Sequence, residues 1–172
     1  MSELALIQHP DSHSPLRAIT AGIERGPSGL LRLTYHAIGL LDQVKVPPPR
    51  PAARGQDLWK HTCFEAFVLA EAGYYEFNFS PSSEWAAYRF DDYRAGMRDA
   101  TAEPSIEWSC DDKAATLSVT LPLPPDLTGP LGLTAVIEGM AGNRSFWALA
   151  HPPGAPDFHH AACFAASLPP AE

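Results

Sequence analysis

The sequence predicts an all-β protein: a two-sheet antiparallel β-sandwich of the jelly-roll or immunoglobulin-like kind, with about ten strands. Two observations lead to this class. The 18 prolines and 12 glycines interrupt the chain so often that long helices should be scarce. The segments between these breakers alternate apolar and polar residues and are rich in β-branched and aromatic side chains, which is the pattern of strands. Short strands at even spacing favour a sandwich or barrel over βαβ units.

The predicted strands follow one another along the whole chain. An early pair covers residues 16–24 and 29–35, a central run covers 62–69, 74–79 and 84–90, and later strands cover 105–110, 115–121, 131–138, 145–150 and 162–168. The segment 62–69 is apolar on both faces, which predicts a central strand covered on both sides. Glu65 in its middle should therefore be buried, with Arg, Trp, Tyr or backbone donors bonded to its carboxylate.

The length of 172 residues fits one domain, so we expect residues 1–172 to form a single unit. A proline-rich segment at residues 45–56 is expected to be an extended, exposed loop inside that domain.

The net charge of −8, with only 12 scattered Lys and Arg residues, argues against nucleic acid or an anionic membrane surface as partner. The N-terminal residues lack a basic region followed by an apolar run, so no signal peptide is visible and a cytoplasmic location is expected. The three cysteines match neither a disulfide framework nor a CxxC metal site, and are expected to be free thiols.

Neither a metal nor a cofactor is expected. The histidine-rich stretch with His151, Asp157, His159 and His160 could supply metal ligands. Adjacent histidines on an extended chain point in opposite directions, however, and the intervening prolines and glycine indicate a turn. The sequence contains no GxSxG, HExxH, GxGxxG or phosphate-binding loop, so a non-catalytic protein is expected.

Two stretches carry a family resemblance. The first is DLWKHTCFEAF at 57–67, followed by YYEFNFSP at 74–81 and WAAY at 85–88; the second is FWALAHPPGAPDFHH at 146–160. Together they resemble the DOMON-like superfamily, in its branch similar to family 9 carbohydrate-binding modules. The resemblance implies a β-sandwich, usually non-catalytic, whose relatives bind sugars or haem at one end.

The same resemblance implies ligand-contacting residues. Trp59 and Glu65 match the spacing of a tryptophan and a glutamate that meet the sugar in those modules. The modules also use an arginine and amides on the following strands, and a second tryptophan near the end. The residues of this chain that correspond to them are Asn78, Arg89, Arg94 and Trp147.

Strand alternation adds Trp85, which lies four residues before Arg89 and so shares its face of the strand. Glu76 and Asn78 share a face of the preceding strand. These four residues gather on one surface in one hairpin register, and a slip of one residue would separate them. We therefore expect Trp59 and Trp85 to line one pocket with Glu65 and with Arg89 or Arg94.

An aromatic platform beside a carboxylate and an arginine suits a carbohydrate or a related polar small molecule. Three alternatives stay open: a small carbohydrate-active hydrolase that uses acidic residues with His151 or His159, a haem-binding domain that uses Met97 or Met140, and a protein-interaction domain with a vestigial pocket. The oligomeric state stays open as well.

Overall fold

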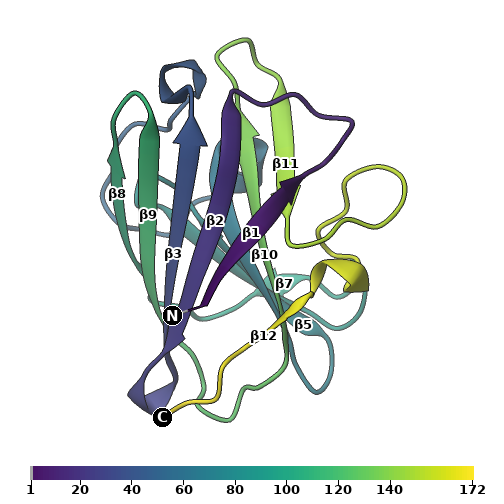
Figure 1. Ribbon diagram of the computed structural model, residues 1–172. Helices are drawn as coiled ribbons and strands as arrows, with labels where there is room; N and C mark the ends of the chain where they lie inside the picture. Colours follow the sequence, from purple (N-terminus) through teal and green to yellow (C-terminus); the bar gives the residue numbers. More distant parts are fainter. Residues whose placement is uncertain (1) are drawn as a thin grey trace.

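The computed structural model describes residues 2–172 and shows twelve antiparallel strands with almost no helix (Figure 1). The strands are β1 (Ser2–Gln8), β2 (Leu16–Arg25), β3 (Leu30–Gly39), β4 (Cys63–Leu69), β5 (Tyr74–Phe79), β6 (Trp85–Phe90), β7 (Arg98–Asp99), β8 (Ser105–Cys110), β9 (Ala114–Pro122), β10 (Pro130–Glu138), β11 (Arg144–Ala148) and β12 (Ala166–Ser167). Four short 3₁₀ turns lie at η1 (Pro27–Gly29), η2 (Leu41–Gln43), η3 (Leu58–Lys60) and η4 (Ala161–Cys163). The prediction of an all-β, antiparallel protein is confirmed.

The strands form one hydrogen-bonded path in the order β7-β6-β5-β4-β10-β11-β1-β2-β3-β9-β8, with β12 paired to β10. The sheet curls at β1, whose residues Ser2–Leu6 pair with β2 while Ile7 and Gln8 pair with β11 (Figure 1). The hydrogen-bonded path is continuous through β1, so the strands form one curled sheet.

The hydrophobic core lies inside the curl, between the two halves of the sheet. On β9 the inward positions Leu117, Val119 and Leu121 are buried, in the alternation that the sequence predicts. Across the core, the ring of Tyr35 on β3 packs on that of Phe64 on β4, with centroids 5.1 Å apart. A hydrogen bond of 2.7 Å from Tyr35 Oη to the backbone oxygen of Glu65 also joins the two halves.

Three parts of the chain differ from the predicted strands. Strands β1 and β7 were not expected, and the predicted strand at 162–168 is instead the η4 turn followed by the two-residue strand β12.

The segment 45–56 forms an extended, largely exposed loop, as expected. Its backbone bonds to β10 through Lys45, to the β5–β6 connection through Arg50 and to β6 through Gly55.

None of the helical turns found in residues 2–172 has the length and apolar character needed to cross a membrane.

Candidate functional site

A cleft of about 400 Å³ opens on the face of the sheet opposite to the core, over strands β4, β5, β6 and β10; we call it the outer cleft. Its aromatic lining consists of Trp59, Tyr88, Phe90, Phe146 and Phe158. Its polar and charged lining consists of Glu65, Glu76, Arg94 and His159, and the remaining lining residues are Met97, Val136 and Pro156.

Strand alternation explains why two carboxyl groups lie on the floor of this cleft. On β4, Phe64, Ala66 and Val68 belong to the core, so Glu65 points to the other face. The β4–β5 register pairs Glu65 with Asn78, which makes Glu76 a diagonal neighbour of Glu65 on the same face.

The floor and wall continue onto the neighbouring strands. The β5–β6 register pairs Glu76 with Tyr88, so the Tyr88 ring stands beside the carboxyl pair. On the other side, β10 pairs Thr134 with Glu65, and β11 pairs Phe146 with Val136.

The long connection between β11 and η4 folds back over the sheet and forms one side of the outer cleft. Its Phe158 and His159 line the cleft. The His159 ring packs edge-on against Phe67 and Phe90, with centroids 5.2 and 5.1 Å away. The start of the connection is tied to β1 and to the residue after it, because His9 Nε2 lies 2.8 Å from the backbone oxygen of Gly154 and His151 Nε2 lies 2.7 Å from that of Ile7.

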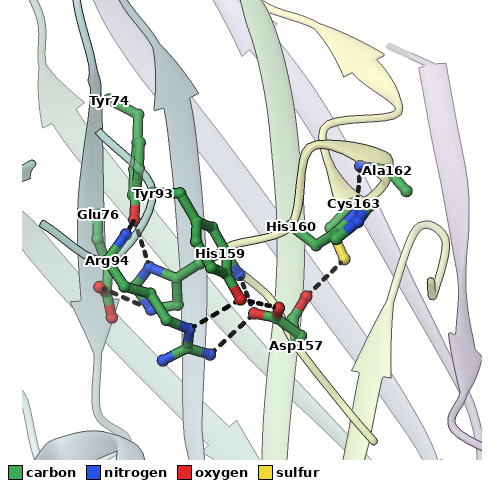
Figure 2. Close-up of polar contacts among 9 residues, drawn as sticks. All are labelled: Tyr74, Glu76, Tyr93, Arg94, Asp157, His159, His160, Ala162 and Cys163. Atoms are coloured by element: carbon green, nitrogen blue, oxygen red, sulfur yellow. Dashed lines mark hydrogen bonds and ion pairs between the residues drawn. The ribbon is translucent and has the colours of Figure 1, made fainter. Parts of the chain in front are cut away.

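A chain of polar contacts connects Arg94 to the floor of the cleft (Figure 2). The Arg94 backbone N–H donates to Tyr74 Oη at 3.2 Å, and Tyr74 Oη lies 2.7 Å from His159 Nδ1. Because Tyr74 Oη already accepts from Arg94, its own proton is free to go to Nδ1. His159 then carries its proton on Nε2, which faces Glu76 Oε2 at 3.5 Å.

The Arg94 side chain is itself held by Asp157. Arg94 Nη2 donates to Asp157 Oδ1 at 2.8 Å, and Tyr93 Oη donates to Asp157 Oδ2 (Figure 2). The backbone of Arg94 has φ = 50°, in the left-handed region that side chains other than glycine rarely adopt. The hydrogen bond from its N–H to Tyr74 and the ion pair with Asp157 hold it there, and such strained residues concentrate at functional sites.

Burial sets the protonation of the floor. It raises the pKa of Glu76 to about 7, against the opposing effects of the Asn78 hydrogen bond and the Arg94 charge. Burial, followed by the nearby charge of Glu76, also raises the pKa of Glu65 well above its ordinary value, while the Thr134 hydrogen bond lowers it. Burial and the charge of Arg94 lower the pKa of His159 to about 4, so its ring is neutral at pH 7. The cleft therefore combines two carboxyl groups that resist losing their protons with a neutral imidazole.

Three of the residues predicted for the site share the outer cleft: Trp59, Glu65 and Arg94. Trp59 lies in the η3 turn before β4 and is 44% exposed, so its ring is accessible at the cleft. The predicted burial of Glu65 is confirmed, since 2% of the residue is exposed. The donor to its carboxylate is Thr134 Oγ1, at 3.0 Å, and not one of the Arg, Trp, Tyr or backbone donors expected.

Trp85 and Arg89 do not line the cleft, because the hairpin register pairs Trp85 with Phe79 and Arg89 with Tyr75 and so turns both to the core side of the sheet. Trp85 packs against the core beneath the guanidinium of Arg54, and Arg89 covers the ring of Tyr75. The expected pocket with both Trp59 and Trp85 is therefore wrong.

The prediction that Trp147 contacts the ligand is also wrong. Trp147 is 3% exposed, belongs to the core and donates from Nε1 to Ser145 Oγ at 3.1 Å. Its neighbour Phe146 points to the outer cleft instead, because successive residues of a strand alternate between faces. Asn78 lies on the cleft side but is fully buried. With its amide nitrogen toward the carboxylate, it donates to Glu76 Oε1 at 3.1 Å.

The sequence did not indicate Tyr88, Phe146, Phe158 or His159 as a wall of the site. The other hairpin register would have indicated Tyr88, because it pairs Tyr88 with Glu76. The position of the 157–159 segment has no signal in strand periodicity, since it depends on how a loop folds back.

The histidine-rich stretch acts as a scaffold in this structure. His160 Nδ1 accepts from the backbone N–H of Ala162 at the start of η4, while His159 turns to Tyr74 and Glu76 (Figure 2). Across residues 2–172, no three His, Cys, Asp or Glu side chains are grouped so that they could hold a metal ion.

No family model and no curated protein matches the chain. Among solved structures, the chain is similar to a protein from Bacteroides uniformis that is described as a putative carbohydrate-binding protein. The similarity has a TM-score of 0.63 over 94% of this chain and 83% of that chain, with 13% sequence identity. At this identity the similarity shows a shared fold alone.

Proposed function

We propose that this protein is a non-catalytic binding domain that holds a carbohydrate in the outer cleft. The observation that carries the proposal is the composition of the cleft: aromatic walls, the half-exposed Trp59, and two buried carboxyl groups on the floor. The C–H face of a sugar ring packs on an aromatic face, and carboxylates accept hydrogen bonds from adjacent hydroxyls.

Two comparisons support this proposal. The Bacteroides uniformis protein of similar fold is described as a putative carbohydrate-binding protein. The resemblance to family 9 modules assigned sugar contacts to Trp59, Glu65 and an arginine, and these two residues and Arg94 line one cleft. On this proposal the facing halves of the curled sheet correspond to the two layers of the DOMON-like β-sandwich.

The arrangement of the carboxyl groups favours binding over glycoside hydrolysis. A glycosidase needs two carboxyl groups on either side of the scissile bond. Glu65 and Glu76 are diagonal neighbours on one face of adjacent strands, so both approach a ligand from the floor. Two acceptors on one side of a ring are suited to orienting hydroxyl groups.

A glycan-array screen followed by calorimetric titration of the best saccharide tests the proposal. Trp59→Ala should weaken binding roughly 5- to 150-fold, in line with the loss of an aromatic anchor worth about 1–3 kcal/mol. Leu40→Ala is the matched control, because Leu40 is 61% exposed and does not line the cleft. The proposal fails if no saccharide binds, or if Trp59→Ala binds as tightly as the wild type while both are folded by circular dichroism.

A further inference from the structure

The floor of the outer cleft has more hydrogen-bond acceptors than the protein's own donors satisfy. Glu65 is 2% exposed and Glu76 is 6% exposed. Thr134 Oγ1 bonds to Glu65 Oε2, and within residues 2–172 no donor reaches Glu65 Oε1. Glu76 receives the Asn78 amide at Oε1, and its Oε2 has only the long 3.5 Å contact with His159. Both residues line the cleft, so these oxygens can accept hydrogen bonds from a ligand bound there.

Within residues 2–172, neither of the basic residues that line the cleft, Arg94 and His159, brings a free positive charge to this floor. Arg94 is paired with Asp157 at 2.8 Å, and Tyr93 Oη donates to the same carboxylate. His159 is neutral at pH 7, because burial and the charge of Arg94 lower its pKa to about 4. Arg94 and Asp157 cancel each other, so an added cation would meet the Glu65 and Glu76 carboxyl groups without a competing positive charge.

The walls of the cleft suit a cation as well. Tyr88, Phe146 and Phe158 line the space above the carboxyl pair, and the negative face of an aromatic ring attracts an ammonium group. The net charge of −8 gives the whole protein a field that favours approach of a cationic ligand.

We propose that the outer cleft selects saccharides that carry a free, positively charged amino group, with the ammonium held between the carboxylates of Glu65 and Glu76. This inference rests on the proposed carbohydrate function and names the class of sugar. An ammonium offers three N–H donors, which matches the open oxygen of Glu65 and the weakly bonded Oε2 of Glu76. Its positive charge also stabilises the ionised form of the carboxyl pair, which a neutral hydroxyl group does not.

The experiment compares sugars that differ in one substituent. The probes are the methyl glycosides of glucose, galactose and mannose, each with its 2-amino-2-deoxy and 2-acetamido-2-deoxy counterpart, titrated calorimetrically at pH 6.0 in 150 mM salt. In the best-bound series the amino sugar should bind at least tenfold more tightly than the other two. Titration in two buffers of different ionisation enthalpy should show proton release with the amino sugar, because the ammonium displaces protons from the carboxyl pair.

Glu76→Gln should reduce the preference for the amino sugar over the neutral sugar to less than threefold, because the amide cannot carry the negative charge that pairs with the ammonium. Glu107→Gln is the matched control, since it removes one negative charge at an exposed position on β8, outside the cleft, and should leave the preference unchanged.

The outcomes separate this inference from the proposed function. If neutral sugars bind as tightly as amino sugars, the inference is overturned and the carbohydrate function stands. If methylammonium alone binds as tightly as the amino sugars, the sugar ring contributes nothing and the carbohydrate function is overturned with it. If no probe of any series binds and the glycan array is also negative, both fail.

Discussion

Replacing Glu76 with Gln should make the protein more stable than the wild type at neutral and alkaline pH, by an amount that grows as the pH rises. The pKa of Glu76 in the folded protein is about 7, above its ordinary value of 4.5. A carboxyl group with a raised pKa destabilises the fold once the pH exceeds its unfolded pKa, because the folded state resists losing the proton. The difference between 4.5 and 7 corresponds to about 3 kcal/mol, reached progressively as the pH rises to about 7 and beyond.

Urea unfolding of both proteins between pH 4.5 and pH 8.5 measures this effect, with the free energy of unfolding taken at each pH. The informative quantity is the difference in the free energy of unfolding between wild type and variant. The lowered pKa of His159 makes both proteins more stable as the pH rises, which is opposite to the effect of Glu76. Folded His159 stays neutral down to about pH 4, so its contribution to stability rises with pH toward 6.5 and cancels in the difference. The raised pKa of Glu76 would be refuted if the difference in the free energy of unfolding changed by less than about 1 kcal/mol over this pH range. It would also be refuted if the wild type became more stable relative to the variant as the pH rises.

Two further predictions concern the rest of the fold. Cys63 and Cys163 are buried, Cys110 is exposed, and burial raises the pKa of Cys163 to about 11. A thiol reagent should therefore modify one cysteine rapidly in the native protein and all three in denaturant. A total of one modified cysteine in denaturant would indicate a disulfide. Arg25 is 5% exposed and donates to the backbone oxygens of Pro124, Leu127 and Pro169. Arg25→Ala should therefore lower the free energy of unfolding, measured by urea titration, by about 2–4 kcal/mol. An effect below about 0.5 kcal/mol would show that these bonds contribute little to stability.

Local patterns in the sequence were sufficient to predict most of the strands. Alternation identifies β9, and the doubly apolar segment 62–69 identifies β4 as a strand covered on both faces, with Glu65 buried in its middle. These features follow from the side-chain period of a strand, which is a local property. Strand β1 was not predicted, although Leu6 belongs to the core.

The composition of the site depended on features that are not local. The connection at residues 80–84, in which Ser83 adopts φ = 83°, sets the register of the β5–β6 hairpin. That register places Glu76 opposite Tyr88 and turns Trp85 to the core; the alternative register would have placed Trp85 beside Glu76. Phe158 and His159 reach the cleft only through the folding-back of their loop, which no strand pattern encodes.

The four tryptophans allow the location of the binding site to be measured directly. Each gives one indole N–H signal in a ¹H–¹⁵N correlation spectrum, and substitution of each residue in turn assigns the four. Trp59 lines the outer cleft, Trp147 is buried in the core, and Trp85 and Trp108 pack against the core. On titration with the saccharide that binds best, the Trp59 signal should shift in proportion to saturation while the other three stay in place. A bound saccharide that moves the signal of Trp85 or Trp108 and leaves that of Trp59 unchanged would contradict binding in the outer cleft.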